Sequence, residues 1–537
     1  MLFSVGVFLR MHAIIDHTLI DDAYITYRYA ANLARGEGLV YNVGERVLGT
    51  TTPGYAVLLG TGGALLGTEQ IPRLSTGLNM VAILALAVVV IAIAYRLTHV
   101  PLVAALAGAV MLLEPTTTQT SIAGMEVSVF LLLVALAVLA LIMERWRVAA
   151  LIAGLSPLFR PEGVFLVGLL GIHLLLLWRW GTWSLRRMLA VGTILVLPGM
   201  LAALLMTLYY GSPIPQSIVA KQAGLYPIPV QDTLAEVLAY LDTLFNTTAV
   251  LPANPEAFEW IGQAWPVLLA LAVTVIGSGA WFVQRHRALW IIPAFLLILI
   301  LFIGTSETLI FPHYFALFAA LTVLCWWIGL YALGAAVLHG LRQASRRGMM
   351  PLLLSVSLTV SAVIALLPQW DRIAWETVET GSVELSNADK RLVAYRDLAK
   401  ALAPLLPPDT VIAMPEIGEL GFFLPDVNVM DTAGLVTPAA TAYFPVAPED
   451  RIDERFGAVP PQMIKDLQPE LLITLDSFLL RGLSDDPWLW EHYTAVVEIR
   501  GDWLPWFGSV IYVLARNDVA PQLDLSAVAQ RFASYSL

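Results

Sequence analysis

Two adjacent carboxylates, Asp21 and Asp22, open the segment of this sequence best equipped for chemistry. The segment, residues 19–53, reads LIDDAYITYRYAANLARGEGLVYNVGERVLGTTTP and begins as an amphipathic helix. One aspartate in this position would cap the helix and favour its positive N-terminal dipole. Because a single carboxylate is enough for a cap, the second is available as a general base or a metal ligand. The residues alone leave both interpretations open.

Three further side chains before residue 369 are candidates for binding an anion such as a phosphate. Lys221 is the only lysine in that part of the chain and follows a Pro-x-Pro turn. Arg160 is the second candidate, and its alternative interpretation is a snorkelling side chain paired with Glu162. His313 lies in FPHYF, a pattern also typical of the aromatic belt at a membrane surface. Each candidate therefore has a functional and a structural interpretation.

A divalent cation is a candidate cofactor, because hard cations prefer carboxylate oxygens. Glu126 is the residue that would join Asp21 or Asp22 around it, although Glu126 equally suits a helix cap. Glu162 and Arg28 are further supporting candidates. No spacing pattern fixes a metal site, so the metal dependence stays open and no cofactor is certain.

The elements that must position these residues are membrane spans. The 537-residue chain is 58% hydrophobic and only 13% charged, with a mean hydropathy of +0.75, whereas soluble domains have about 25% charged residues. This composition excludes an ordinary cytosolic enzyme. The single cysteine, Cys325, excludes an internal disulfide and a cysteine-rich metal site.

The apolar runs predict a polytopic α-helical membrane protein with about 11 transmembrane helices. The runs cover residues 1–15, 74–95, 101–113, 124–143, 148–160, 163–178, 188–210, 262–284, 288–304, 311–338 and 349–368. Arginine clusters alternate with acidic or neutral loops if residues 53–67 form a re-entrant or surface-lying helix, which places the N-terminus inside. The predicted outer face then carries the unusual polar residues: Asp16, Asp21, Asp22, Glu114, Glu126, Arg160, Glu162, Lys221 and His313. The first run is predicted to be a retained span, since no signal-peptidase site follows it.

The chain is predicted to change character after residue 368. Residues 1–368 form the predicted transmembrane catalytic domain, with outer loops 16–53 and 211–261, and residues 369–537 form a soluble extracytoplasmic α/β domain. A helix is expected over 386–406, and TVIAM, VNVMD, ELLITL, AVVEIR and SVIYVLAR are expected to be short buried strands. This segment holds 25 of the 41 acidic residues and 12 of the 30 basic ones, so its net charge is -13 and the rest of the chain is near neutral. Its acidity argues against nucleic acid as a partner.

The order of several motifs resembles the GT-C glycosyltransferases, polytopic enzymes that use polyprenyl-phosphate-linked sugars. The first outer loop carries most of the resemblance. The remaining motifs follow in the same order: GMEVSVF, LFRPEGVF, YYGSPIPQSIVAKQ, PHYF, GELGFF and DTAGLVTP. The pattern is most similar to the bacterial branch of arabinofuranosyl- and mannosyltransferase-like proteins, and it does not identify one sugar.

The resemblance implies that Asp21 or Asp22 is the catalytic base, and we assign Asp21 as the base with Asp22 as its partner. It implies a polyprenyl-phosphate sugar donor, a glycan, lipid or protein acceptor, and a plasma-membrane enzyme working on the outer face in cell-envelope glycan or glycolipid synthesis. Direct displacement of the phosphate would invert the anomeric centre. Asp21, Asp22, Arg160 and Lys221 are expected to converge on one outward-facing cavity.

Two other functions compete with this one. A transporter or flippase of lipid-linked sugars would need ionisable groups near the bilayer midplane, and the predicted spans have almost none. A metal hydrolase in the C-terminal domain would need clustered histidines, and this domain has only His492. Its acidic residues, Glu416, Glu419, Asp426 and Asp431, suit turns between strands. We expect this domain to shape access for the acceptor or lipid.

Overall fold

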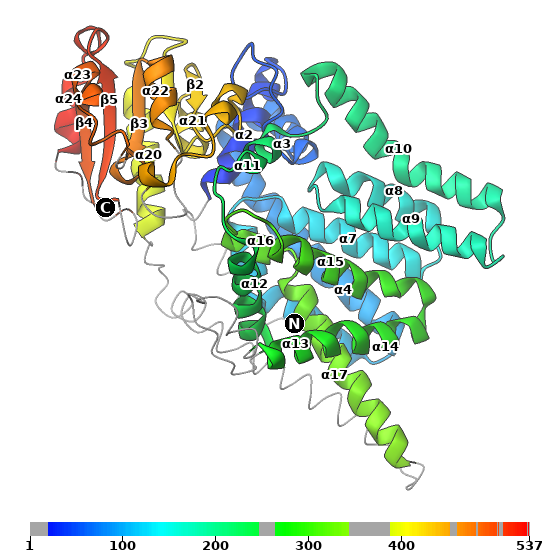
Figure 1. The fold of residues 1–537 in the computed structure, drawn as a ribbon. Helices are drawn as coiled ribbons and strands as arrows, with labels where there is room; N and C mark the ends of the chain where they lie inside the picture. Colours follow the sequence, from blue (N-terminus) through cyan, green and yellow to red (C-terminus); the bar gives the residue numbers. More distant parts are fainter. Residues whose placement is uncertain are drawn as a thin grey trace. The chain divides into compact units, whose positions relative to one another are not determined.

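The computed structural model describes residues 20–245, 264–342, 387–451, 459–479, 482–501, 503, 508–533 and 535 (Figure 1). The predicted spans at 1–15 and 349–368, Asp16 and the predicted domain boundary at 368 lie outside these residues. The chain divides into two compact units. The helical unit comprises Met1–Asp16, Thr76–Leu201 and Pro229–Val383, and the α/β unit comprises His17–Ser75, Ala202–Ile228 and Glu384–Leu537.

The helical unit is built from the predicted apolar runs, and every run within the described residues is helical. Its helices are α4 (Ile71–Thr98), α5 (Pro101–Leu113), α6 (Pro115–Ile122), α7 (Val127–Ile142), α8 (Trp146–Leu155), α9 (Gly163–Arg179), α10 (Leu185–Tyr210), α12 (Val230–Phe245), α13 (Trp265–Ala272), α14 (Ser278–Arg285), α15 (Ile291–Gly304), α16 (Pro312–Phe315) and α17 (Ala319–Arg342). Within the described residues, five continuous helical stretches are long and apolar enough to span a membrane: Thr68–Thr98, Leu185–Tyr210, Trp265–Arg285, Arg287–Gly304 and Ala319–Ala336. The count of about 11 spans stays a prediction.

The run at 311–338 differs from its prediction as one continuous helix. Phe311 is extended, the short helix α16 begins at Pro312, and α17 begins only at Ala319. The residue before a proline is driven towards extended backbone, and the proline itself suits the first turn of a helix. The structure therefore separates the PHYF motif from the helix that follows it.

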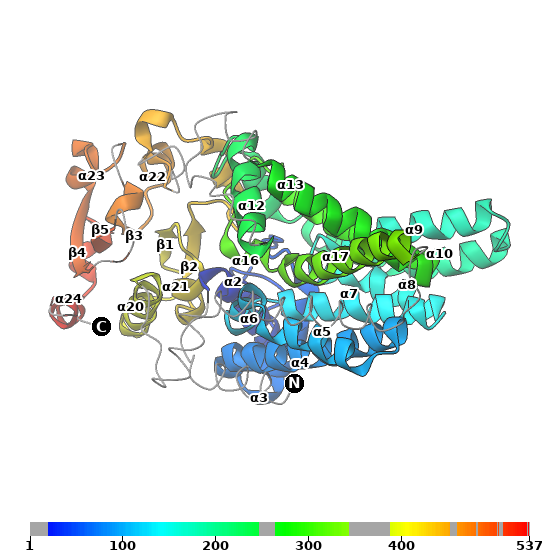
Figure 2. The same cartoon turned by 90° about the horizontal axis from the view of Figure 1, so that it is seen from below.

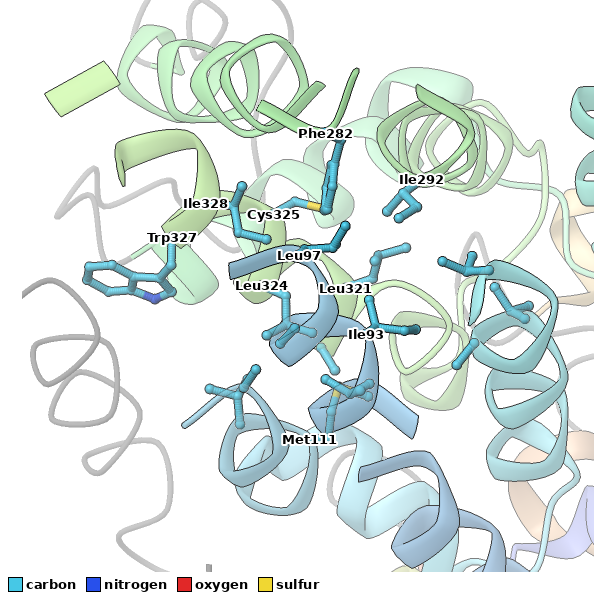
Figure 3. Close-up of a pocket in the computed structure, with 18 of the residues that line it drawn as sticks. Ile93, Leu97, Met111, Phe282, Ile292, Leu321, Leu324, Cys325, Trp327 and Ile328 are labelled. Carbon is cyan, nitrogen blue, oxygen red and sulfur yellow. The ribbon is translucent and has the colours of Figure 1, made fainter. Parts of the chain in front are cut away.

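An apolar cavity of about 280 Å³ lies within the helical unit (Figure 3). It is enclosed by side chains of α4, α5, α14, α15 and α17, among them Ile93, Met111, Phe282, Ile292 and Cys325. The Cys325 thiol is free and fully buried. It behaves as a small apolar side chain in the wall of this cavity.

The α/β unit contains a five-stranded sheet. Its strands are β1 (Val411–Met414), β2 (Asn428–Asp431), β3 (Leu471–Leu475), β4 (Tyr493–Arg500) and β5 (Val510–Arg516). Each lies where the sequence predicted a strand. The spatial order is β2-β1-β3-β5-β4. Strands β2, β1 and β3 are parallel, whereas β5 is antiparallel to both β3 and β4.

Helices cover both faces of this sheet (Figure 2). One face carries α20 (Asn387–Leu402), α21 (Gly418–Phe423) and α24 (Ser526–Phe532), and the other carries α22 (Pro461–Leu467) and α23 (Pro487–His492). Strand residues alternate between the two cores: Ile412 and Ile473 pack in the first, and Ala413 and Leu472 in the second. This alternation follows from the two-residue period of a strand.

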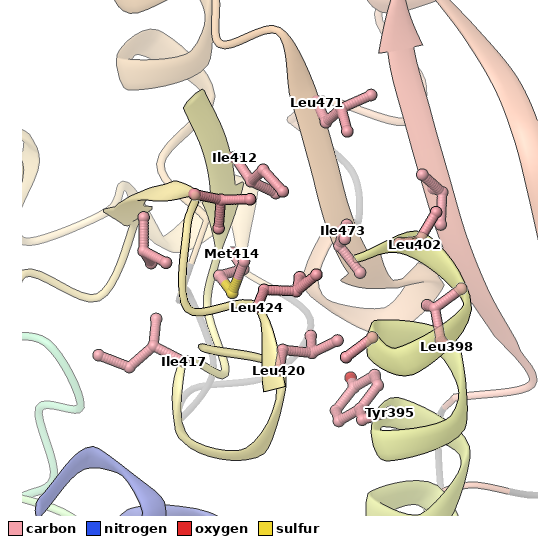
Figure 4. Close-up of a cluster of buried hydrophobic side chains, with 14 of the residues drawn as sticks. Tyr395, Leu398, Leu402, Ile412, Met414, Ile417, Leu420, Leu424, Leu471 and Ile473 are labelled. Atoms are coloured by element: carbon pink, nitrogen blue, oxygen red, sulfur yellow. The ribbon is translucent and has the colours of Figure 1, made fainter. Parts of the chain in front are cut away.

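The segment 20–53 contributes to the larger of these cores. Tyr395, Leu398 and Leu402 of α20 pack with Leu420 and the strands (Figure 4). The same buried cluster includes Ile25 and Tyr29 from the helix that opens this segment and Tyr41 from the loop after it. Residues separated by more than 350 positions thus share one apolar core. The segment is a structural part of the unit that contains the sheet.

Helix α2 (Asp21–Arg35) carries the two adjacent carboxylates at its start. It ends at Gly36, whose φ of 87° is left-handed and whose N–H bonds to carbonyls of the last turn. Helix α3 (Pro53–Leu66) packs on it, and a Cβ at Gly60 would lie 2.9 Å from the carbonyl oxygen of Ala30. At 14 residues, α3 is too short to cross a bilayer, consistent with the prediction for 53–67.

Arg28 on α2 is buried and joins three segments of the α/β unit. Its Nε donates to the carbonyl of Tyr41 at 2.9 Å. Nη1 donates to Gly421 at 2.5 Å and Leu424 at 3.1 Å, and Nη2 donates to Val427 at 2.8 Å. The guanidinium also stacks 4.5 Å from the ring centroid of Tyr41. Arg28 thereby satisfies the carbonyls at the end of α21, and its role is structural.

We expect Arg28→Met to lower the free energy of unfolding by at least about 2 kcal/mol, because several buried carbonyls lose their donors together. The matched control is Arg35→Met, which removes an exposed arginine from the same helix. Thermal unfolding of both variants in the same detergent measures the difference. Equal stabilities would show that the Arg28 contacts do not hold the unit together.

Candidate active site

The candidate site lies where three chain segments of the α/β unit meet. Helix α2 supplies Asp21 and Asp22, helix α11 (Gln216–Gln222) supplies Lys221, and the loop after β1 supplies Glu416. That loop follows the carboxyl end of a parallel strand. The chain moves from β1 to β2 on one side and returns to β3 on the other, so this edge is a topological switch point. Such edges are common ligand sites in α/β sheets.

Asp21 is held by the backbone of the α/β unit. Its Oδ2 accepts the N–H of Gly418 at 2.9 Å, and its Oδ1 accepts the N–H of Glu419 at 2.8 Å. A Cβ at Gly418 would collide with the main-chain carbonyl of Asp21, so this approach requires glycine. Burial and the charge of Glu416 raise the pKa of Asp21 to about 7, although the two N–H donors partly offset them. Both oxygens of Asp21 are therefore committed to docking α2 onto α21.

Asp22 has a different electrostatic environment from its neighbour. Burial raises the pKa of Asp22 above its ordinary value, the nearby positive charge of Lys221 lowers it, and the charge of Glu416 raises it again. The result combines a carboxylate with raised basicity and an adjacent cation. Tyr226 lies four residues after the end of α11. Burial, together with the charges of Glu416 and Asp22, raises the pKa of its hydroxyl.

Arginines and a tyrosine of α20 bind Glu416 in the loop after β1 and Glu419 in the first turn of α21. Glu416 pairs with Arg391 at 2.8 Å and accepts the hydroxyl of Tyr395 at 2.6 Å. Glu419 is fully buried and pairs with Arg396 at 2.6 Å. Burial raises the pKa of Glu419 to about 7. These contacts fix the loop that receives Asp21.

Asp431 at the end of β2 has the turn role considered as its alternative. Its two carboxylate oxygens accept the N–H groups of Ala433 and Val436, each at 2.9 Å. Burial raises its pKa to about 6. The DTAGLVTP motif therefore forms a tight turn beside the switch-point edge, and Gln216 donates from α11 to the carbonyl of Gly434 at 3.2 Å.

In the helical unit, Arg160 forms a buried ionic group with two glutamates. Its Nη1 donates to Glu126 at 2.7 Å, while Nε and Nη2 donate to the two oxygens of Glu162 at 3.0 and 3.1 Å. All three side chains are almost fully buried. The pairing with Glu162 is the structural alternative named for Arg160. Its donors already serve two carboxylates, which weakens the case for Arg160 as a phosphate ligand.

His313 and Glu114 also make contacts that suit a structural role. The His313 ring is buried, parallel to Phe311 with centroids 5.8 Å apart, and lies 4.6 Å from the ring of Tyr314. Glu114 accepts the N–H groups of Thr116 and Thr117 at the start of α6, at 3.1 and 2.7 Å, and so caps that helix.

The predicted site residues belong to two different units of the structure. Asp21, Asp22, Lys221 and Arg28 belong to the α/β unit, whereas Arg160, Glu126, Glu162 and His313 belong to the helical unit. Convergence of the two groups stays a prediction. Sequence analysis did not identify Tyr226, and it treated Glu416 as turn chemistry. The only signal for Tyr226 was its position just after the isolated lysine.

Two of the predicted metal ligands, Asp21 and Glu126, already accept hydrogen bonds from other protein groups. No three histidine, cysteine, aspartate or glutamate side chains in this part of the chain are arranged to hold a metal ion. Asp21 accepts backbone N–H groups with both oxygens, and Glu126 accepts from Arg160.

Comparisons with known proteins identify the fold. Residues 385–520 match a family model described as a domain of unknown function, DUF8728. No curated protein matches the chain. The crystal structure of apo ArnT from Cupriavidus metallidurans superposes with a TM-score of 0.50 at 16% identity, over 96% of this chain and 97% of that one. The Archaeoglobus fulgidus oligosaccharyltransferase in its apo form gives a TM-score of 0.49 at 10% identity, over 95% and 73%.

The likeness to ArnT extends over nearly the whole of both chains and shows a GT-C fold, as the sequence motifs predicted. The fold and the long apolar helices also identify a multi-pass membrane protein. An identity of 16% carries no further statement about activity.

The two neighbouring aspartates should respond differently to the same substitution. We expect Asp21→Asn to lower the free energy of unfolding by about 1–2 kcal/mol, because an amide has one acceptor oxygen for two N–H donors. Asp22→Asn, the matched control, should lower it by less than half as much. Thermal unfolding of the purified variants tests this, and equal losses would contradict the docking role of Asp21.

Proposed function

Because the chain has the GT-C fold, we propose that it is a membrane glycosyltransferase that moves a sugar from a polyprenyl-phosphate donor to an acceptor hydroxyl. The observation that carries the proposal is the placement of Asp22 under the influence of Lys221, beside a second aspartate that is already bonded to backbone. A carboxylate next to a cation suits a reaction that needs a base and releases a phosphate.

Asp22 is the base in this proposal, which reverses the assignment made from sequence. Asp21 cannot approach a substrate without giving up two backbone hydrogen bonds. Asp22 takes the proton of the acceptor hydroxyl as its oxygen bonds to the anomeric carbon, and the bond from that carbon to the phosphate oxygen breaks. A raised pKa makes the carboxylate a stronger base, and a positioned base contributes typically about 10²- to 10⁴-fold.

Lys221 is the group that stabilises the departing lipid phosphate. A lysine acts on phosphate as a compact charge, and its position near Asp22 places that charge beside the reacting centre. Arg160 has no phosphate-binding role in this proposal, because it already binds Glu126 and Glu162. His313 is a secondary phosphate contact in the proposal, because its ring packs among aromatic rings. Direct displacement gives inversion at the anomeric carbon.

The proposed setting is the outer face of the plasma membrane, with the sheet-containing segment extracytoplasmic. The distribution of arginines supports this orientation. An outer site fits a role in cell-envelope glycan or glycolipid synthesis, with a glycan, lipid or protein as acceptor. No step of the proposed mechanism uses a divalent cation. The identity of the donor sugar depends on the shape of the substrate-binding site.

Purified protein should transfer sugar from at least one member of a panel of polyprenyl-phosphate sugars. We expect Asp22→Asn to lower kcat by about 10²- to 10⁴-fold, because the acceptor hydroxyl loses its base. Asp21→Asn should lower activity mainly in proportion to lost folded protein. Radiolabelled donor and chromatographic separation of product measure both.

The same assay separates the enzyme from a transporter of lipid-linked sugars. A transporter would release no free polyprenyl phosphate in detergent but would move labelled lipid across a vesicle membrane. Normal sugar transfer by the Asp22→Asn variant would refute the role of Asp22. Absence of transfer from every donor, together with movement of labelled lipid, would refute the glycosyltransferase.

Lys221→Gln should move the acid limb of the pH profile of kcat/KM to higher pH. The positive charge of Lys221 lowers the pKa of Asp22, so its removal raises that pKa and a higher pH is needed to ionise the base. Lys221→Arg keeps the charge and should leave the limb near its original position. An unchanged limb in Lys221→Gln would show that the two groups are not coupled during catalysis.

A further inference from the structure

A second concentration of charge lies in the helical unit and plays no part in the proposed reaction. A hollow of about 600 Å³ is formed where the turn before α8 faces the start of α10. We call it the arginine hollow, and its polar lining is Glu144, Arg145, Arg147, Ser184, Arg186 and Arg187. Four guanidinium groups thus face one carboxylate. All four arginines are exposed to solvent.

Aromatic rings pack beside the arginine hollow, and one of them, Trp146, belongs to its lining. The Arg187 guanidinium stacks 4.0 Å from the ring centroid of Trp183, and Trp183 meets Trp146 edge to face at 5.0 Å. Trp146 lies parallel to His173 with centroids 5.7 Å apart, and His173 accepts the indole N–H of Trp290 at 3.0 Å. Stacking on indole orients a guanidinium and leaves its N–H groups available to an anion.

Apolar side chains directly beside the arginine hollow point outwards. Val148 of α8 is 45% exposed, and Leu185 and Leu189 of α10 are 48% and 54% exposed. Helix α10 continues this surface as one of the long apolar helices. In a multi-pass membrane protein such a surface faces acyl chains. A ligand that matches both the arginines and the apolar surface has an anionic head group and hydrocarbon tails.

We propose that the arginine hollow binds the head group of an anionic phospholipid, with the phosphodiester among the four guanidiniums and the acyl chains along α10. The clustering of arginines on one side of the membrane follows from the rules of topology alone. These topology rules do not require that four arginines from the starts of two helices line one hollow. They also do not require that one of these arginines stacks on tryptophan. Basic pockets between helices are the usual form of such lipid sites.

The experiment measures lipid binding to the purified full-length protein by native mass spectrometry, with phosphatidylglycerol and phosphatidylcholine as probes. We expect wild type to prefer phosphatidylglycerol. Each arginine removed should weaken that binding by about fivefold at low salt, so R145Q/R147Q and R186Q/R187Q should each lose about 30-fold. The preference should also fall as ionic strength rises.

The matched control is R285Q/R287Q, which removes two arginines of the helical unit that do not line the hollow. It should keep its affinity for phosphatidylglycerol. The charge-conserving variant R145K/R147K/R186K/R187K should retain most of it and guards against a folding defect. Thermal unfolding of each variant in the same detergent confirms that the protein is folded.

Three outcomes would overturn the proposal. One is equal binding of the two lipids by wild type. Another is an equal loss of phosphatidylglycerol binding in R285Q/R287Q and in the hollow variants. The third is complete displacement of phosphatidylglycerol by millimolar inorganic phosphate, which would identify the hollow as a site for soluble anions.

Discussion

The α/β unit depends on a buried guanidinium that is bonded to main-chain carbonyls. Arg28 reaches Tyr41, Gly421, Leu424 and Val427, which belong to segments almost 400 positions apart. A buried carbonyl without a donor is costly, and a buried cation without acceptors is costlier. Each therefore requires the other, and a neutral side chain cannot substitute. This mutual requirement fixes α2 against α21.

The position of the carboxylates follows from that constraint. With α2 fixed, Asp21 reaches the two N–H groups that begin α21, and Asp22 is set beside them at the edge of the sheet. The two adjacent residues consequently have different contacts. One carboxylate completes the fold, and its neighbour remains near a lysine that arrives from a third segment. The two identical side chains therefore have different surroundings, although they are adjacent in the chain.

Local patterns predicted the secondary structure well for physical reasons. Within the described residues, the apolar runs are helices and the five short β-rich runs are strands, because periodicity and burial are local properties of a chain. The pairing of Arg160 with Glu162, two residues away, was also one of the two interpretations that the sequence offered. The partners of Arg28 and Asp21, and the second partner of Arg160, could not be predicted, because each lies far along the chain or is a backbone atom that any residue provides.

The choice between the alternatives for individual residues depends on their contacts in the folded protein. From sequence, Asp21 and Asp22 are nearly equivalent, and only the N–H groups of Gly418 and Glu419 distinguish them. Arg160 offered a phosphate ligand or an ion pair, and the nearby Glu126 and Glu162 decide in favour of the ion pair. In the first case the deciding partners are backbone atoms, and in the second Glu162 was named from the sequence, whereas Glu126 lies 34 positions away.

The shared core of the α/β unit also has a consequence for the time course of synthesis. Ile25, Tyr29 and Tyr41 emerge from the ribosome early, whereas the strands that bury them, up to Val513, come last. At about 5–20 residues per second, the early segment waits on the order of half a minute or longer for its partners. During that interval its apolar side chains have no native core. The core of the α/β unit is complete only after the segments from Ile25 to Phe532 have been made.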